Sequence, residues 1–207
     1  FQEWIKFKPK SITGIDILNY SESWNNIKDY FSKNKIRIEI KFEQKNITEI
    51  ESHKIYDFIV SDAVFEHLKD FSFAIKKCNS LLKTSGVMYA SYGPLWYCHG
   101  GDHFSNRHDV KQGFNHLLIS QEEYMNFFRE NVTNLDNEIK LHGSAGIFVK
   151  ENLFSKLTGN QYMDEYSKNN LYSEFTAVEF CPISFKMVKS DKILCKKLLN
   201  TTKFRDL

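Results

Sequence analysis

The sequence lacks the features that mark several large classes of protein. Its formal net charge is only +2, from 28 basic and 26 acidic residues, so it has no domain-wide basic excess of the kind that binds nucleic acid. No apolar run approaches the roughly 20 residues that span a bilayer, and the first residues do not form a signal peptide. We therefore predict no nucleic-acid partner and no membrane span.

Cysteine is present four times but never as a C-x-x-C pair. Cys78, Cys98, Cys181 and Cys195 lie far apart in the sequence, which argues against a zinc knuckle and against a dense disulfide framework. A reducing, cytoplasmic setting is the simpler interpretation. An initial methionine is also lacking, so we expect a piece of a longer chain.

What the sequence has in abundance is aromatic and other apolar residues. Aromatic residues make up 15% of the chain, with 18 Phe and 10 Tyr, and the hydrophobic fraction is 42%. A chain of 207 residues with this composition can bury a substantial core. We expect one domain over residues 1–207, with a core built largely from aromatic rings.

Two short apolar runs predict neighbouring strands in the middle of the chain. The run from Asp57 to Val60 stops abruptly at Ser61 and Asp62, which is typical of a central strand that delivers polar groups at its carboxyl end. Residues 87–90 predict the second strand. With a crossover helix between them, the two strands form one parallel βαβ unit, and such units bind ligands beyond the carboxyl ends of their strands. Function is therefore expected just after residues 60 and 90.

The crossover helix has both a start and a stop signal. Apolar residues recur at helical spacing from Phe71 to Leu82, and Asp70 is placed to cap the first turn. Thr84-Ser85-Gly86 is expected to end the helix, because glycine tolerates the left-handed conformation that closes it.

The elements before this unit alternate between helix and strand. Ile36, Ile38, Ile40 and Phe42 alternate with charged residues, which is the pattern of an edge strand. We expect a helix tail at residues 1–5, followed by a strand at 11–17. Next comes a helix with Trp24, Ile27 and Phe31 on one face and Ser21 or Ser23 as its cap. The strand at 36–42 follows this helix. The predicted fold class is α/β, a Rossmann-like, mostly parallel, doubly wound sheet in which the strands at 11–17, 36–42, 56–61 and 86–91 are neighbours, with helices on both faces.

The elements after this unit are less regular. Residues 93–116 are dense in Gly, His and aromatic residues, and Ser120 to Glu123 is a capping box that opens a helix burying Tyr124, Phe127 and Phe128. Further expected elements are helices at 161–168 and 192–199 and strands at 174–180 and 183–188, divided by Pro182. We predict an active-site loop region at 93–119 and an acceptor-side insertion at 131–172.

Two segments carry a resemblance to a known family. YDFIVSDAVFEHLKD, followed by LLKTSGVMYAS, resembles class I S-adenosylmethionine-dependent methyltransferases, which commonly show a strand, Glu-His, and a helix that ends in Leu-Lys-x-x-Gly. A strand that closes on Asp, as in GIDI, is a second feature of that family. The resemblance runs from residue 1 to about residue 124 and implies S-adenosylmethionine as the cofactor.

The resemblance also implies roles for particular residues. Asp16 is placed to accept hydrogen bonds from the two ribose hydroxyls, Ile17 to lie against the adenine, and Asn46-Ile47 to hold the adenine edge. Glu66 and His67 either orient the amino-acid end of the cofactor or only cap and pack the start of a helix. Because the strand ends of one parallel sheet meet, we expect Asp16, Asn46 and Ile47 to line one pocket with Ser61 and Asp62.

One family feature is absent from the sequence. The Gly-rich loop that lets the backbone approach the methionine part of the cofactor should precede the helix that ends at Phe7, which is where this chain begins. We expect a chain trimmed at both ends. A non-catalytic Rossmann-like binding module is therefore the competing interpretation.

A narrower resemblance concerns the acceptor. GPLWYCHGGDHF and FNHLLIS are similar to methyltransferases of sugar and surface-polysaccharide biosynthesis, which implies a hydroxyl acceptor on a sugar or an activated glycan precursor. Methyl transfer to nitrogen shares the fold and remains open. Tyr92, Trp96 and Tyr97 are candidates for stacking on a sugar, or for packing in an aromatic-rich core.

Histidines in this region are the candidate bases. A neutral imidazole accepts a proton near neutral pH, and His103 in its Gly-rich loop is the first candidate, with His116 second. The alternative is that His103 only hydrogen-bonds to the backbone. His99, Asp102, His103 and His108 also have the chemistry of metal ligands, but they match no fixed spacing of a known site, so no metal is predicted.

Overall fold

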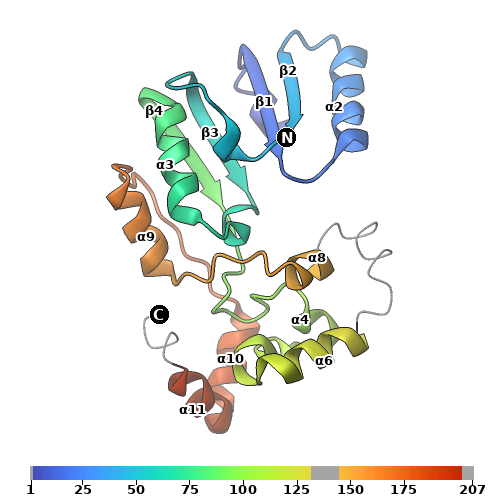
Figure 1. Cartoon of the computed structure of the whole chain (residues 1–207), viewed down its shortest axis with the longest axis vertical. Helices are drawn as coiled ribbons and strands as arrows, with labels where there is room; N and C mark the ends of the chain where they lie inside the picture. The colour runs from blue at the N-terminus through green and yellow to red at the C-terminus, as the bar shows by residue number, and fades with distance from the viewer. Residues whose placement is uncertain (1, 132–144, 202–207) are drawn as a thin grey trace. The chain divides into compact units, whose positions relative to one another are not determined.

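The computed structural model describes residues 2–131 and 145–201 of the chain. The chain divides into two compact units, residues 1–53 and residues 54–207, which we call unit 1 and unit 2 and describe separately. Most of their helices and strands are labelled in Figure 1. Part of the expected acceptor-side insertion, residues 132–144, lies outside the described residues.

Unit 1 is a parallel strand pair with its crossover helix. Its elements are α1 (Gln2–Ile5), β1 (Ser11–Asp16), α2 (Ser21–Lys33), β2 (Glu39–Gln44) and the 3-10 turn η1 (Ile47–Glu49). β1 pairs with β2 in parallel, with Ser11 opposite Glu39 and Asp16 opposite Gln44. Trp24 of α2 stacks on Phe42 of β2 with ring centroids 5.7 Å apart, which fixes the helix against the strands. The predicted order of elements is confirmed here.

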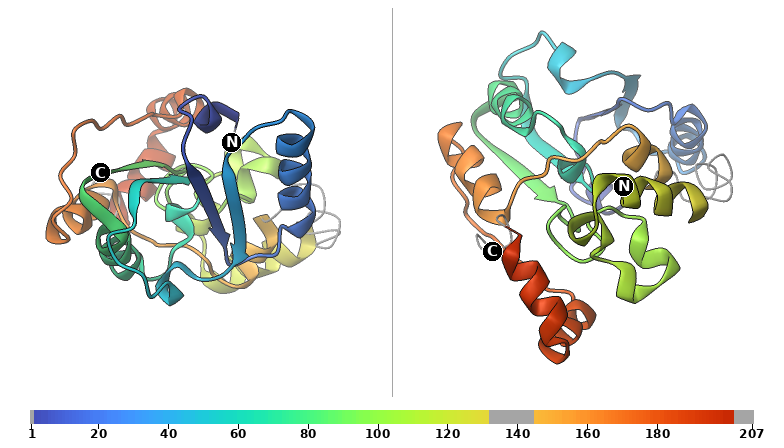
Figure 2. Two further views of the ribbon diagram at one scale, coloured as in Figure 1. Left: turned by 90° about the horizontal axis from the view of Figure 1, so that it is seen from above. Right: turned by 60° about the horizontal axis from the view of Figure 1, so that its bottom comes forward.

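Unit 2 begins with the predicted central βαβ unit. It consists of β3 (Tyr56–Asp62), the 3-10 turn η2 (Phe65–His67), α3 (Phe71–Leu81) and β4 (Leu82–Ser91). β3 and β4 are parallel, with Ser61 opposite Ala90. The Asp70 carboxylate accepts a hydrogen bond from the Phe73 N–H at 3.0 Å, so the predicted cap is confirmed. The buried residues of α3 recur at helical spacing, and the helix lies beside the strands (Figure 1, Figure 2).

The remainder of unit 2 is helical. Its elements are α4 (Ser105–His108), η3 (Val110–Gln112), α5 (Asn115–Leu118), α6 (Gln121–Asn131), α8 (Ala145–Lys150), α9 (Gly159–Lys168), α10 (Pro182–Ser190) and α11 (Lys192–Asn200). Ser120 and Glu123 form the predicted capping box, since each side chain accepts the other residue's N–H. The predicted helices near 161–168 and 192–199 are likewise confirmed. An aromatic-rich core is also confirmed, with Phe104, Tyr124, Phe128 and Phe154 buried in one cluster.

In the described residues the predicted four-stranded sheet is seen only as one parallel strand pair in each unit, β1 with β2 and β3 with β4. A single crossover helix joins the two strands of each pair. Phe58, Val87 and Tyr89 remain more than 40% exposed, which fits a sheet whose faces are only partly covered.

The two strands predicted near the C-terminus are wrong. Residues 174–180 form no regular element, and α10 begins at Pro182. Proline suits the first helical position because the N–H that it lacks has no intrahelical partner there. Phe175 and Phe180 are at least 80% exposed, so their strand propensity is not supported by packing against a neighbouring strand.

Several boundaries differ for local reasons. α3 passes directly into β4 at Leu82, and Ser85, not Gly86, takes the left-handed conformation, at φ 65°. Gly86 is required by space instead, because a Cβ there would lie 3.0 Å from a methyl carbon of Leu82 and from a backbone oxygen.

The start of unit 1 shows two further differences. Tyr20, not Ser21 or Ser23, is the N-cap of α2, and its side chain makes no capping hydrogen bond. β2 begins three residues later than predicted, since the Ile36 N–H closes the end of α2 by bonding to the Phe31 carbonyl at 2.9 Å.

No helix in the described ranges is both long enough and apolar enough to cross a membrane.

Candidate functional site

Polar groups gather where β3 ends, as the sequence predicts. Ser61 is buried, and its hydroxyl oxygen has no hydrogen-bond partner among the described residues. Asp62, the next residue, is exposed and lies opposite Ser91 of β4. The two strand ends are joined by the Ala63 N–H, which donates to the Ser91 carbonyl at 2.8 Å.

Glu66 bridges the segments that follow the two strands. It is only 2% exposed, and its Oε1 accepts a hydrogen bond from the Gly93 N–H at 3.0 Å. Its Oε2 is buried without a partner among the described residues. Burial raises the pKa of this carboxyl, and the charge of Asp62 adds to the effect, while the bond from Gly93 opposes it.

His67 lies beside Glu66 and is held on two sides. Its Nδ1 donates to the Leu153 carbonyl at 2.9 Å, and its ring stacks on Phe148 with centroids 3.7 Å apart. Burial lowers the pKa of His67 to about 4, so the ring is neutral at pH 7. The bond to Leu153 therefore leaves Nε2 as the nitrogen with a free lone pair.

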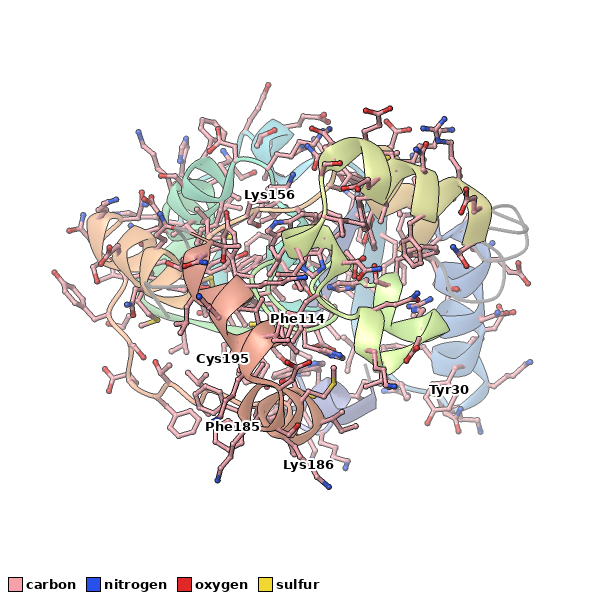
Figure 3. All side chains as sticks on the ribbon, turned by 90° about the horizontal axis from the view of Figure 1, so that it is seen from below. Tyr30, Phe114, Lys156, Phe185, Lys186 and Cys195 are labelled. Carbon is pink, nitrogen blue, oxygen red and sulfur yellow. The ribbon has the colours of Figure 1, made fainter. Side chains whose placement is uncertain are left out.

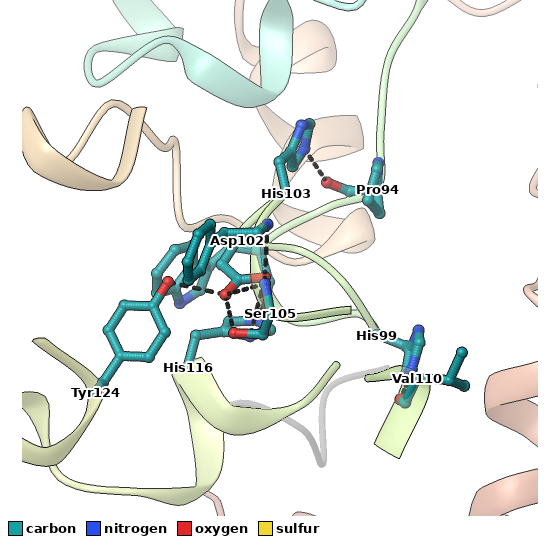
Figure 4. A network of polar contacts seen from close by, with 10 residues as sticks. Pro94, His99, Asp102, His103, Ser105, Val110, His116 and Tyr124 are labelled. Atoms are coloured by element: carbon teal, nitrogen blue, oxygen red, sulfur yellow. Dashed lines mark hydrogen bonds and ion pairs between the residues drawn. The ribbon is translucent and has the colours of Figure 1, made fainter. Parts of the chain in front are cut away.

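His103 approaches the same place from the loop after β4. It has φ 57°, a left-handed conformation that is uncommon outside glycine, and its Nε2 donates to the Pro94 carbonyl at 3.2 Å (Figure 4). Burial lowers the pKa of His103, so this imidazole is neutral with its lone pair on Nδ1. The rings of His67 and His103 meet edge to face, with centroids 4.7 Å apart.

The glycines of this loop allow its tight path. Gly100 has φ 71°, and a Cβ on Gly101 would collide with the Leu95 and Trp96 carbonyl groups. Because only glycine fits against that backbone, Gly101 brings the loop close to residues 95–96. The next residues, Asp102 and His103, are positioned by this contact.

Asp102 forms a separate, buried polar cluster (Figure 4). Its Oδ2 accepts from the Tyr124 hydroxyl at 2.8 Å and from the Ser105 hydroxyl, and its Oδ1 accepts from the Ser105 N–H at 3.2 Å. The His116 side chain is fully buried nearby, with Nδ1 3.8 Å from Asp102 Oδ1 and Nε2 donating to the Trp96 carbonyl at 2.6 Å. The cluster ties the loop to α6 and α5.

His99, Asp102 and His103, considered as metal ligands in the sequence, do not come together among the described side chains, and the His108 side chain lies outside them. His99 donates to the Val110 carbonyl at 2.7 Å, and Asp102 is enclosed by Ser105 and Tyr124. The structure instead brings His103 to Glu66 and His67, with one ligand atom from each within 4.8 Å of the others. Sequence spacing gives no signal for this grouping, because 36 positions separate His67 from His103.

The aromatic residues considered for sugar stacking take part in packing. Tyr97 is 9% exposed, and Tyr92 accepts a hydrogen bond from the Tyr166 hydroxyl at 3.3 Å. Trp96 packs on Phe154 at 4.6 Å between centroids, and the Lys156 ammonium lies 4.5 Å from the Trp96 ring. The packing interpretation therefore accounts for these three side chains.

In unit 1, Asp16 closes β1 as predicted. Its Oδ1 accepts from the Leu18 N–H at 2.8 Å, and burial raises the pKa of this half-buried carboxyl. Ile17 is 52% exposed, and the Asn46 side chain caps η1 by accepting from the Thr48 N–H at 3.0 Å, just before Ile47. The pocket expected to join these residues to Ser61 and Asp62 stays a prediction, since the two units are described separately.

A groove also lies between α10 and α11, with a volume of about 570 Å³. Phe185 and Cys195, one from each helix, are labelled in Figure 3. Its lining is apolar with lysines at the rim, and none of the predicted site residues contributes to it. The groove is therefore separate from the residues described above.

Comparison with known proteins identifies the family. Residues 2–135 match a family model described as a methyltransferase domain. The chain belongs to this methyltransferase domain family, and its cofactor is S-adenosylmethionine. A search of curated proteins finds no match.

Two solved structures are similar to the chain at low identity. The first is the crystal structure of a protein from Galdieria sulphuraria assigned as a sarcosine dimethylglycine methyltransferase. It has 15% identity to this chain and a TM-score of 0.37, and the match covers 77% of this chain and 65% of the other. The second is PKMT2 from Rickettsia typhi in complex with AdoHcy, with 16% identity, a TM-score of 0.43, and coverage of 90% of this chain and 40% of the other. This chain therefore spans less than two thirds of the length of each.

Each unit contains residues that fit one part of the cofactor. S-adenosylmethionine carries ribose hydroxyls, which are donors, and an amino-acid end with an ammonium group. Asp16 offers a half-buried carboxylate, and Ser61 Oγ and Glu66 Oε2 are buried polar atoms without partners in the described part of the chain. Buried polar atoms are normally hydrogen-bonded, so these two are free to receive a ligand.

Proposed function

We propose that this protein transfers a methyl group from S-adenosylmethionine to a hydroxyl of a small molecule, a sugar or an activated glycan precursor. Membership of the methyltransferase domain family supports the reaction class. The hydroxyl acceptor is supported by a neutral histidine in the loop that follows β4. The four free cysteines, spread along the described chain, are consistent with a cytoplasmic location.

The observation that carries the proposal is the state of His103. Its Nε2–H is committed to the Pro94 carbonyl, so Nδ1 holds a free lone pair, and burial keeps the ring neutral. A neutral imidazole in this state accepts a proton from a hydroxyl as the oxygen attacks, which contributes typically about 10²–10⁴-fold to the rate. His116, the second candidate, has a fully buried side chain and is less accessible to an acceptor.

The binding roles follow from the same contacts. Bound S-adenosylmethionine supplies an electrophilic methyl group on a sulfonium. Asp16 accepts hydrogen bonds from the ribose hydroxyls, Ile17 and the Asn46-Ile47 pair contact the adenine, and Ser61, Asp62, Glu66 and His67 hold the amino-acid end. The loop at 93–119 then covers the acceptor and excludes water from it.

The test is transfer of an isotopically labelled methyl group from S-adenosylmethionine to a panel of nucleoside-diphosphate sugars and free sugars. We expect a labelled methoxy product, detected by NMR, and binding of S-adenosylhomocysteine by calorimetry. Binding without transfer to any acceptor would favour a non-catalytic module. Label found only on amine acceptors added to the panel would favour an N-methyltransferase, and either result would overturn the proposal.

A further inference from the structure

The three side chains at the centre of unit 2 have the composition of a metal site. Glu66 and His67 come from η2 and His103 from the loop after β4, and one ligand atom from each lies within 4.8 Å of the others. Four ligands around zinc, at bond lengths of about 2.0–2.2 Å, are separated by about 3.4 Å. Small rotations of the three side chains would therefore close this cluster around an ion.

One polar atom of each side chain is already held. His67 Nδ1 donates to the Leu153 carbonyl, His103 Nε2 donates to the Pro94 carbonyl, and Glu66 Oε1 accepts from the Gly93 N–H. Histidine ligands of metals almost always donate their other N–H to a backbone carbonyl or a carboxylate, which fixes the tautomer and the ring orientation. Both imidazoles here meet that condition before any ion is bound.

The atoms left over are all lone-pair donors. The bonds above leave His67 Nε2 and His103 Nδ1 without protons, and Glu66 Oε2 is a buried oxygen with no partner in the described ranges. An unpaired buried acceptor destabilises the fold, and more so when it is charged.

Aromatic rings lie beside both histidines. The Phe148 ring stacks on His67, and Phe154 lies 6.0 Å from His103 between ring centroids, so an apolar wall limits access of water. Two histidines and one carboxylate form a known three-ligand set for zinc, with a fourth position open. We propose that Glu66, His67 and His103 bind one divalent ion of the zinc type, a property independent of the proposed methyl transfer.

The ion and the acceptor would use the same lone pair of His103, so the two proposals describe different states of the protein, and each is measured without the other. The metal site is therefore tested by binding alone, with no methyl donor present. Failure of one proposal then leaves the other to be judged on its own measurement.

The experiment is a calorimetric titration of the chelator-treated chain with zinc chloride, with cobalt chloride as a spectroscopic probe. We expect one ion per chain, and a cobalt spectrum without thiolate bands because no cysteine is a ligand. His67→Ala, His103→Ala and Glu66→Gln should each lower zinc affinity by at least about tenfold. His99→Ala is the matched control from the same loop and should leave the affinity unchanged.

Glu66→Gln keeps the size of the side chain, and circular dichroism verifies that each variant is folded. Zinc binding that is absent in the wild-type chain, or equally tight in all three variants, would overturn the proposal. Thiolate bands in the cobalt spectrum would do the same, because they would place the ion on a cysteine.

Discussion

Two clusters of unit 2 each place a carboxylate beside histidine, and they differ in how fully the carboxylate oxygens are bonded. His116 Nδ1, beside Asp102, is also buried without a hydrogen-bond partner in the described chain. Both oxygens of Asp102 accept hydrogen bonds, from Ser105, Tyr124 and the Phe104 N–H. Glu66 has one bonded oxygen and one buried oxygen without a partner in the described chain. Both acids are almost completely buried, so exposure does not explain the difference.

We propose that this difference separates a structural cluster from a functional one. A buried carboxylate that is fully bonded stabilises the fold, whereas one left unpaired costs stability and is retained where a ligand uses it. We therefore assign the Asp102 cluster to holding the loop on α5 and α6. The Glu66 cluster, with His67 and His103, is assigned to binding and chemistry.

The largest expected effect is on turnover, at His103. His103→Ala should reduce turnover of the acceptor by about 10²–10⁴-fold while leaving S-adenosylhomocysteine binding nearly intact, because the proton acceptor is removed. His103→Asn should not rescue activity, since an amide does not accept the proton at neutral pH. His99→Ala is the control from the same loop. Loss of cofactor binding in step with turnover would make His103 structural and remove the contrast between the clusters.

The next largest effect is on stability, at Asp102. Asp102→Ala leaves the Tyr124 and Ser105 hydroxyls buried without an acceptor, so the free energy of unfolding should fall by about 2–4 kcal/mol in urea titration. Asp109→Ala, an exposed cap of η3, should cost less than about 1 kcal/mol. Equal costs at the two positions would show that the Asp102 cluster does not hold the loop.

In unit 1, Asp16 is an acid that is half-buried and only partly hydrogen-bonded. Asp16→Ala should lower the affinity for S-adenosylhomocysteine by more than about tenfold, because a hydrogen bond to a charged acceptor contributes roughly 1.5–3 kcal/mol. Asp29→Ala, an exposed acid on α2, should leave the affinity unchanged. Unchanged affinity in Asp16→Ala by calorimetry would remove Asp16 from the binding residues.

A smaller effect is expected on the pH dependence of stability, at His67. Its pKa of about 4 when folded lies below the ordinary value of 6.5, so the unfolded chain binds more protons between these values. Stability should therefore fall as pH drops from about 6.5 to about 4, by about 1–2 kcal/mol after allowance for solvent screening. The lowered pKa values of His103 and His116 act in the same direction, and the raised pKa of Glu66 opposes them.

His67→Gln should make this pH dependence shallower in urea titrations at pH 7 and pH 4.5. His53→Gln, at an exposed position of unit 1, is the control and should leave it unchanged. An unaltered profile in His67→Gln would mean that the ring is not desolvated in the folded chain.

Local signals in the sequence were sufficient for much of the fold. Asp70 and the Ser120 to Glu123 capping box predict helix starts because their partners lie three residues away. The two parallel strand pairs follow from the same local signals, because one crossover helix joins the strands of each pair. The exposed stretch at 174–180 was misassigned because its strand-forming side chains have no adjacent strand to stabilise them.

The candidate site was predictable only in part. Glu66, His67 and His103 were each identified, the first two from the family motif and the third from its loop. The sequence did not predict that these three residues lie together. Their grouping depends on contacts such as that between His67 and Leu153, which are 86 positions apart. The hydrogen bonds of Asp102 were not predictable either, because Tyr124 donates to it from α6.

The central claim is that Glu66 is held unpaired for a ligand and Asp102 is bonded for the fold. It is tested most directly by the free energy of unfolding of Glu66→Gln and Asp102→Asn, measured by urea titration at pH 7 in the presence of a chelator. Glu66→Gln should leave stability unchanged or raise it by up to about 1 kcal/mol, because the buried unpaired charge is removed. Asp102→Asn should lower stability by at least about 1.5 kcal/mol, since its NH₂ group cannot accept the bonds that it replaces. A loss in Glu66→Gln as large as that in Asp102→Asn would contradict the account.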